Sequence, residues 1–533
     1  MNSVQLYNGR VETMLPRARA RKALTYCGNR ILSVETKSGS SATGKNLRRI
    51  NLRGATVLPG FVDAHTHFQF FAQSLDRVNL ADALSLGEAL ATIKSRARKL
   101  KQSEWLFGEA LDVSRWSPCR LPTAAELDSA TPGRPAAIYY KDQHTLCANS
   151  LALKLAGINA STRNPRGGHI DRLSDGAPSG ILRENSAIEL VLKLIPAPTK
   201  SEFTKLYNRA LESAHSRGVT GVHSFDRAPG VFEFFRDRVD KRQPGLRVNY
   251  YIPFEELDNS DVVKNHQLSD DYWLTVSGVK IFADGSLGSK TALMHSNYLG
   301  EPDQYGVEVT TLAEMKKIIR RAKALGWPCA IHAIGDKAVT NVINALADIP
   351  APDGKRHRIE HLQIMRRSDL PELKRSKAVA SMQPSHLPGD VEAIARNWGK
   401  LRGRNAYLFR TFLDCGIPLA FGSDVPIEPL DPLGGIYDSA ARRCKSTGAI
   451  LNKFERITAW EAARAFTYGA AFAVSQENRR GVLAPGYHAD MVILDCDLRT
   501  ASAKLLKAAR VLATIIGGKC VYSDGTLSLE KEI

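Results

Sequence analysis

The sequence lacks any apolar run that approaches the roughly 20 residues a membrane-spanning helix requires. Its opening segment, MNSVQLYNGRVETMLPRARARK, has no apolar core of the kind that a secretory signal peptide carries. Low-complexity tracts and internal repeats are missing as well. These absences argue against a membrane, secreted or repeat protein, and we expect a cytoplasmic protein with no membrane partner.

Cysteine pairs at metal-binding or redox spacing are also missing. The eight cysteines are scattered through the 533 residues, and no two stand at C-x-x-C spacing. Most of them lie inside apolar stretches, which predicts reduced, buried thiols. The distribution argues against a disulfide framework and against a thiolate metal site.

Basic residues are in excess, with 73 Lys and Arg against 55 Asp and Glu and a net charge of +18. Such a charge could suit nucleic acid, an anionic membrane surface or an acidic substrate. The basic residues fall in short clusters, however, and neither an aromatic-interleaved basic stripe nor a nucleic-acid motif is present. We therefore expect no specific nucleic-acid partner.

Helix, short loop and apolar strand recur along the middle of the chain. Ser85 and Glu88 stand at capping-box spacing before one predicted helix, and Thr311 and Glu314 before another. Apolar strands such as WPCAIHAIG follow these helices, as in parallel sheets with helical crossovers. The Gly- and Pro-rich stretch at about 105–195 breaks this pattern, and we interpret it as an insertion.

Both ends of the chain have strand-like sequence instead. Apolar and polar residues alternate over residues 3–14 and 22–36. Short strands such as HADMVILD recur over residues 480–533. Because both ends have the pattern of β-strands, we expect them to join in one small domain.

Polar residues interrupt the apolar strands at or near their ends. In a parallel barrel the carboxyl ends of the strands form the active-site face. Alternation puts His65 and His67 of VDAHTH on the same side of their strand. Imidazole and carboxylate ligands suit zinc or a similar divalent ion, so the pattern predicts a metal site. The candidate ligands are His65, His67, Lys280, His332, His361 and Asp424.

Lys280 is the unusual member of this set, because metal cations repel a protonated ammonium. A lysine with a lowered pKa could instead react with carbon dioxide, and the resulting carbamate could bridge two metals. Taken singly, a histidine in an apolar strand is more often a core residue, a strand-end lysine a surface residue, and an aspartate a helix cap. The recurrence of these residues from strand to strand favours a metal site.

Longer motifs resemble a known family. VLPGFVDAHTH, GVKIFADGSLGSKTA, IHAIGDKAV, RIEHLQ, SMQPSH, AFGSDVPIEPLDPL and GVLAPGYHADMVILD are similar to the amidohydrolase 3 branch of the amidohydrolase superfamily, the group that includes N-substituted formamide deformylase. The resemblance implies an α/β fold with a (β/α)8 TIM-like barrel over residues 58–479. It also implies a composite β-sandwich made from residues 1–57 with 480–533.

The same resemblance implies a role for each candidate ligand. His65 and His67 with Asp424 would bind the more buried metal, and His332 with His361 the second. Lys280 would bridge the metals as a carbamate. Asp424 would also act as general base, taking a proton from water and passing it to the leaving amine. The expected cofactor is one or two divalent metal ions, with zinc as the expected metal.

Other polar residues are candidates for the pocket around this centre. Asp284 and Glu360 adjoin ligand positions and are predicted to orient the ligands. The relatives often show a DGHSAWVNS-like motif where this chain has DQHTLCANS, so the specificity of a relative does not transfer directly. The candidate substrate contacts are His144, His386, Asp390 and Arg404.

These features favour a hydrolase that acts on a small molecule. The leading hypothesis is cleavage of a non-peptide C–N bond, in a linear amide or an N-substituted formamide, by metal-activated water. The alternatives are cleavage of an ester, lactone or cyclic amide at the same site, a barrel scaffold without catalysis, and a binding module driven by the positive charge. By family analogy we expect a homodimer.

Overall fold

The computed structural model describes residues 3–16, 19–36, 47–101, 104–113, 116–141, 145–165, 168–196, 198–228, 230–259, 263–264 and 273–531. The chain divides into two compact units. One consists of Met1–Phe71 with Ala210–Ile533, and the other of Ala72–Arg209.

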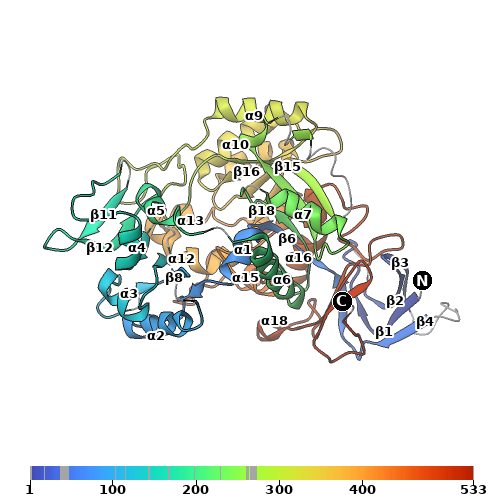
Figure 1. Cartoon of the computed structure of the whole chain (residues 1–533). Helices are drawn as coiled ribbons and strands as arrows, with labels where there is room; N and C mark the ends of the chain where they lie inside the picture. The colour runs from blue at the N-terminus through green and yellow to red at the C-terminus, as the bar shows by residue number, and fades with distance from the viewer. Residues whose placement is uncertain are drawn as a thin grey trace. The chain divides into compact units, whose positions relative to one another are not determined.

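An eight-stranded parallel sheet forms the centre of the larger unit (Figure 1). Its neighbouring strands follow chain order, which is the arrangement that successive strand–helix–strand units produce. The strands are largely buried, as expected for a parallel sheet that is covered on its outer face, and several of them also contain buried polar residues. In sheet order they are β6 (Phe61–Thr66), β13 (Val219–Ser224), β14 (Arg247–Pro253), β15 (Leu274–Phe282), β16 (Cys329–Ala333), β17 (Arg358–His361), β18 (Val379–Met382) and β19 (Leu419–Phe421).

The first and last strands of this sheet are joined through the segment that follows β19. The Asp424 N–H donates to the His65 carbonyl over 2.7 Å, and Thr66 pairs with Val425 in parallel orientation. These contacts nearly close the sheet, and the predicted barrel is thereby confirmed. They also bring Asp424 beside the end of β6, where His65 and His67 lie.

Helices connect the barrel strands. The capping box predicted at Thr311 and Glu314 is present at the start of α9, and Met315 and Ile319 lie on the buried face of that helix. Along the chain, α6 (Lys200–Ser216) leads from the smaller unit into the larger. α1 (Phe68–Ser74) spans the other boundary between the units. The remaining α-helices with described bounds in the larger unit are α7 (Val231–Asp240), α9 (Leu312–Ala324), α10 (Asp336–Asp348), α11 (Leu370–Ser376), α12 (Leu387–Asn397), α13 (Gly399–Gly403), α14 (Phe409–Asp414), α15 (Pro432–Ala441), α16 (Ala459–Arg464), α17 (Ala470–Ala473) and α18 (Ala503–Ala508).

Strands from both ends of the chain form a second eight-stranded sheet, in which Figure 1 shows blue and red strands together. β5 pairs with β20 in antiparallel orientation and so joins the two sets. Leu6, Val57, Met491 and Ile515 share its apolar core. The small domain expected from both chain ends is confirmed. In sheet order the strands are β22 (Lys519–Ser523), β21 (Val511–Ile516), β20 (Met491–Leu494), β5 (Thr56–Pro59), β1 (Ser3–Val11), β2 (Arg21–Cys27) and β3 (Arg30–Glu35), with β4 (Leu47–Asn51) also paired to β1.

The unit Ala72–Arg209 has a six-stranded sheet of its own. Thr123 and Glu126 form a capping box at the start of α3. The unit includes the whole predicted insertion at about 105–195 and extends beyond it on both sides. Its elements are β7 (Val78–Asn79), α2 (Leu86–Ala97), β8 (Leu106–Leu111), α3 (Ala124–Ala130), β9 (Ala136–Tyr140), β10 (Thr145–Ala148), α4 (Ser150–Leu155), β11 (His169–Arg172), β12 (Pro178–Arg183) and α5 (Asn185–Leu192).

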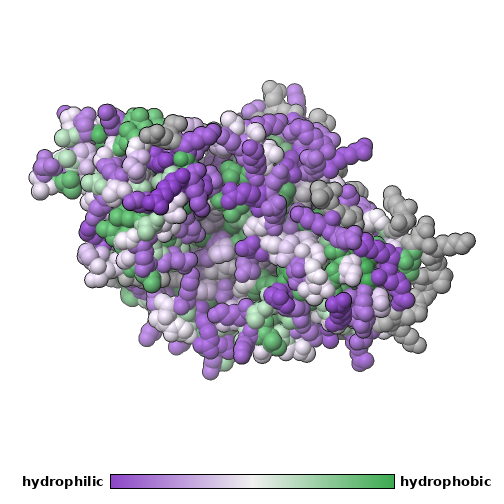
Figure 2. All heavy atoms as spheres, turned by 60° about the horizontal axis from the view of Figure 1, so that its bottom comes forward, coloured by the Kyte–Doolittle hydropathy of each residue, from purple (hydrophilic) through white to green (hydrophobic). Residues whose placement is uncertain are grey.

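Hydrophilic residues predominate on the face shown in Figure 2, with small hydrophobic areas between them. Within the described ranges, no helix is both long enough and apolar enough to cross a membrane. Surface charges are partly paired, as in Arg120–Glu126 and Lys316–Asp348. Exposed pairs of this kind add little stability. Each pair joins one positive and one negative charge, so the pairs do not explain the large net charge.

Candidate metal centre

The six candidate ligands come from five strands or the segments that follow them, and they meet at the carboxyl ends of the barrel strands. The ring of His361 is central, because its centre lies 4.8 Å from that of His65 and 4.4 Å from that of His332. Their positions follow the strand order: His65 and His67 at the end of β6, Lys280 in β15, His332 in β16, His361 at the end of β17 and Asp424 after β19.

His65, His67 and Asp424 form the closest group. The Nε2 atoms of His65 and His67 lie 3.5 and 3.4 Å from Asp424 Oδ1. One ligand atom from each residue lies within 4.8 Å of the others. Zinc binds imidazole nitrogen and carboxylate oxygen at about 2.0–2.2 Å, so three atoms at this spacing can share one ion.

Several polar atoms of the candidate ligands are unpaired. Among the described residues, Lys280 Nζ, His361 Nδ1 and Asp424 Oδ1 are buried and have no hydrogen-bond partner. Such groups are uncommon in folded proteins unless a ligand, ion or water satisfies them. The donor atoms present therefore fit a divalent metal ion.

Burial keeps the imidazoles of His65, His332 and His361 neutral. It lowers the pKa of His65 to about 4 and that of His332 to about 3, and it holds the pKa of His361 well below its usual value. Neutral imidazole is the form that coordinates a metal. Burial also lowers the pKa of Lys280 to about 8, which increases the fraction of uncharged amine near neutral pH.

Two of the candidate ligands have a left-handed backbone conformation. The φ angle is 68° at His361 and 63° at Asp424. A conformation of this kind costs on the order of 1–3 kcal/mol in a residue other than glycine and persists where the surroundings enforce it. Strained backbone therefore coincides with two of the strand ends that carry the candidate ligands.

A buried ion pair supports His65 from behind. His65 Nδ1 donates to Glu360 Oε2 over 2.6 Å, which leaves Nε2 for a ligand. Arg358 Nε and Nη2 donate to the same carboxylate over 2.5 and 3.0 Å. Arg358 Nη2 also reaches Ala64 O on the opposite side of the barrel and Ser381 Oγ, each over 2.5 Å. Glu360 thus contacts a candidate ligand directly, and its other partner is Arg358, which sequence analysis missed.

Asp63 was also missed. Its Oδ1 accepts from His65 N over 3.1 Å and from Ser423 N over 2.9 Å, so it ties β6 to the loop that carries Asp424. The two segments approach so closely at Gly422 that a Cβ there would lie 2.3 Å from His65 N. The first motif, VDAHTH, contains Asp63, but its role depends on a contact across the closure of the barrel.

Asp284 lies behind His332. It accepts from the main-chain N–H groups of Leu293, Ile334 and Gly335 over 2.8–3.0 Å. His332 Nε2 donates to Gly285 O over 3.0 Å and lies 3.5 Å from Asp284 Oδ1. This contact leaves the Nδ1 atom of His332 for a ligand. Burial raises the pKa of Asp284 to about 7.

The four predicted substrate contacts differ in how near they lie to the cluster of candidate ligands. His386 Nε2 lies 3.7 Å from Asp424 Oδ2, at the edge of the cluster. Asp390 Oδ2 accepts from the Tyr407 hydroxyl over 2.5 Å. Arg404 is exposed at the end of α13, and within the described part of the chain no polar contact joins its side chain to the cluster. His144 lies outside the described residues.

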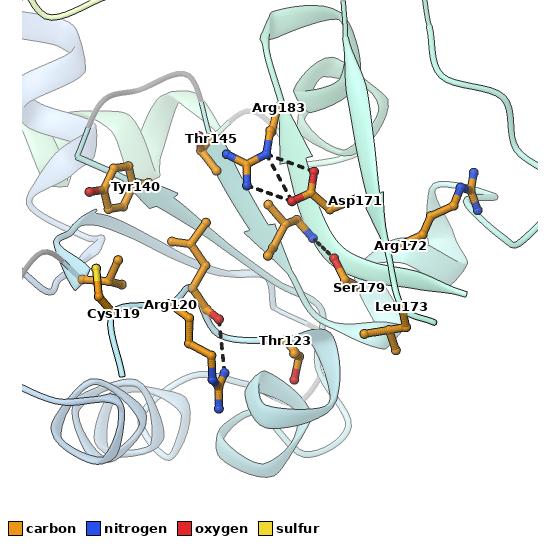
Figure 3. A pocket seen from close by; sticks show the side chains of 13 residues that line it. Cys119, Arg120, Thr123, Tyr140, Thr145, Asp171, Arg172, Leu173, Ser179 and Arg183 are labelled. Carbon is orange, nitrogen blue, oxygen red and sulfur yellow. Dashed lines mark hydrogen bonds and ion pairs between the residues drawn. The ribbon is translucent and has the colours of Figure 1, made fainter. Parts of the chain in front are cut away.

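A separate hollow of about 610 Å³ lies in the unit Ala72–Arg209 (Figure 3). Two of its arginines are already engaged: Arg183 Nη2 donates to Asp171 over 2.8 Å, and Arg120 pairs with Glu126 at 2.6 Å. Its described lining contains no histidine. The hollow therefore has no set of ligands like that of the barrel cluster.

Comparisons with known proteins agree with this geometry. Residues 48–522 match the sequence model of the amidohydrolase family. The chain is 31% identical to the protein YtcJ of Bacillus subtilis (strain 168), which is named as an amidohydrolase, over 92% of each chain. It is 27% identical to N-substituted formamide deformylase of Arthrobacter pascens, over 100% of this chain and 99% of that protein. The crystal structure of an uncharacterized metal-dependent hydrolase from Pyrococcus furiosus matches with a TM-score of 0.77 and 28% identity, over 93% of this chain and 100% of the other.

Proposed function

Because this chain belongs to the amidohydrolase family, it is a metal-dependent hydrolase, and we propose that it cleaves a C–N bond other than a peptide bond. A linear amide or an N-substituted formamide is the proposed substrate. The observation that carries the proposal is the meeting of His65, His67 and Asp424 around one point, beside buried atoms without partners. The likeness to a formamide deformylase supports the choice of bond.

We assign the metal ligands as follows. His65, His67 and Asp424 would hold one divalent ion, and His332 and His361 would hold a second. Lys280 is buried in β15, beside the strand that carries His332, and its uncharged amine could attack carbon dioxide. The new N–C bond forms as the amine loses a proton, and the product is a carbamate anion that suits two cations. A zinc-like ion held by these residues would make hydroxide available at neutral pH, because such an ion lowers the pKa of bound water from 15.7 to about 7.

Asp424 is the proposed proton carrier. Its Oδ1 faces His65 and His67, and its Oδ2 faces His386. The carboxylate accepts a proton from the attacking water and delivers it to the amine nitrogen as the C–N bond breaks. The burial of the site limits competing exchange with bulk water and strengthens electrostatic interactions there.

Metal content per chain tests this assignment. We expect two equivalents of a zinc-like metal in protein purified without chelator, and a sharp fall in Lys280→Ala. The control is Lys241→Ala, because Lys241 forms an exposed pair with Asp237 on α7. One equivalent that does not change in Lys280→Ala would make the lysine structural. Absence of metal from the wild-type protein would contradict the assignment.

A matched amide and ester test which kind of bond the protein cleaves. We expect hydrolysis of formanilide, and preferential cleavage of phenyl formate would favour an ester substrate instead.

The cytoplasmic location and the homodimer also stay predictions. Cell fractionation tests the location, and sedimentation velocity tests the homodimer.

A further inference from the structure

β18 lies between two strands that lead to candidate ligands but contributes none itself. β17 ends at His361 on one side, and β19 precedes Asp424 on the other. Gln383 follows β18 directly, with φ −119° and ψ 93°. The pairing with the next strand continues to this point, because Met382 O accepts from Gly422 N over 3.0 Å. Gln383 is therefore level with the strand ends that carry the metal centre.

Alternation along β18 directs the Gln383 side chain into the barrel. Ser381 Oγ accepts from Arg358 Nη2 over 2.5 Å, and the same guanidinium reaches Ala64 O of β6 across the barrel. Ser381 therefore faces the barrel interior. Residues two apart in a strand point to the same side. Since Gln383 is extended and two residues after Ser381, its side chain points to the interior at the level of the ligands.

The carboxamide of Gln383 is buried and incompletely paired. The residue is 1% exposed, and its Nε2 has no hydrogen-bond partner among the described residues. Burial of an unpaired amide is unfavourable, so such a group calls for a ligand that completes it. Gln383 also begins the turn that carries His386, whose N–H donates to Gln383 O over 3.2 Å.

We propose that Gln383 is a substrate-binding residue whose Nε2 donates a hydrogen bond to the carbonyl oxygen of the scissile amide. This inference rests on the proposed function. As water adds to the carbonyl carbon, the oxygen gains negative charge, so a fixed donor stabilises the transition state more than the bound substrate. The carboxamide is uncharged and therefore adds no repulsion toward metal cations. Its effect is expected mainly in kcat.

Gln383→Met tests the donor in the zinc-loaded full-length protein with formanilide as substrate. Methionine keeps the length of the side chain but cannot donate. We expect kcat to fall about 10²- to 10³-fold, as for the loss of one oxyanion donor, with little change in KM and unchanged metal content. The thermal unfolding midpoint should stay the same or rise, since an unpaired buried amide is removed, whereas a structural role predicts a fall.

Gln476→Met is the matched control. Gln476 is half-buried, and its Nε2 donates over 3.1 Å to Asn249 Oδ1 in the first half of β14, away from the strand ends that carry the ligands. We expect its kcat for formanilide to equal that of the wild type.

Binding of phenylphosphonate, measured by titration calorimetry, gives a readout that does not depend on turnover. Its tetrahedral anion resembles the hydrolytic transition state. A Kd at least about tenfold higher in Gln383→Met, as expected for a lost hydrogen bond to a charged oxygen, supports the inference. Equal Kd values or equal kcat values overturn it. If the wild type binds phenylphosphonate but does not cleave formanilide, the amide substrate is wrong, and the difference in Kd still decides the role of Gln383. If the wild type neither binds phenylphosphonate nor cleaves formanilide, both proposals are overturned.

Discussion

Replacement of Glu360 by glutamine tests whether the Glu360 carboxylate orients His65 for metal binding. The Glu360 carboxylate accepts from His65 Nδ1 through one oxygen and from Arg358 through both. Burial alone would raise the pKa of Glu360, but Arg358 and His65 hold it well below its usual value, so the group is a carboxylate. A carboxamide has one acceptor oxygen instead of two. With its oxygen at the Oε2 position it would keep His65 and Arg358 Nη2 but turn an N–H donor toward Arg358 Nε, and in the opposite orientation the donor would meet His65 Nδ1 and Arg358 Nη2. It therefore cannot satisfy all three contacts.

The expected magnitudes follow from these contacts. A hydrogen bond to a charged group contributes about 1.5–3 kcal/mol, and about 1.4 kcal/mol changes a binding constant tenfold. Glu360→Gln should therefore weaken zinc binding roughly 10- to 100-fold, the usual range for residues that orient metal ligands. Arg358 is fully buried, and a buried charge without its partner destabilises a fold by about 3–5 kcal/mol.

Competition with a chromophoric zinc chelator measures the affinity, and urea unfolding of metal-free protein measures the stability. Glu477→Gln is the control, because Glu477 also pairs with an arginine, Arg356, but its side chain is 24% exposed. We expect that variant to lose no more than about 1 kcal/mol and to keep its zinc affinity. If Glu360→Gln and Glu477→Gln bind zinc equally well, the support assigned to Glu360 is wrong.

Two further predictions concern the closure of the barrel and its contact with the terminal sheet. Gly422→Ala should lose metal and about 1–3 kcal/mol of stability, because its Cβ would lie 2.3 Å from His65 N, whereas Gly389→Ala, which meets nothing within 4 Å, should lose neither. Equal metal content in the two variants by elemental analysis would contradict the steric argument. Burial alone would raise the pKa of Asp490, but Arg247 holds that pKa below its usual value. The ionised Asp490 therefore stabilises the fold fully above the unfolded pKa of about 3.9. This stabilisation is lost as the pH falls through the folded pKa. Asp490→Asn should therefore flatten the acid side of a plot of unfolding temperature against pH, and an unchanged slope would rule out this role.

Local patterns were enough to predict parallel strands with helical crossovers and to select residues at the strand ends, and the family resemblance added the barrel. His65 and His67 are two residues apart, so alternation alone predicts that they face one side. Longer motifs predicted the amidohydrolase family, and the family match confirms it. The roles proposed for individual residues, including the exposed Arg404, stay predictions.

The supporting residues were harder to find because their partners are distant in the sequence. Arg358 contacts Ala64 O, and Asp63 contacts Ser423 N, only after the barrel has closed. In the sequence, a charged residue in a short motif such as RIEHLQ also looks like an ordinary polar residue at the end of a strand. A usable signal existed, since Arg358 is two residues before Glu360 and thus shares its strand face. Gln383 could have been found in the same way from Ser381.

The pairing of β5 with β20 also bears on how the chain is made. The outer edge of β5 has no partner until Met491–Leu494 has left the ribosome. At about 5–20 residues per second, the roughly 430 residues between Pro59 and Met491 take on the order of 20 to 90 s to synthesise. During that time an unpaired strand edge is open to pairing with other chains. The nascent protein must therefore keep this edge apart from neighbouring polypeptides until translation is almost complete.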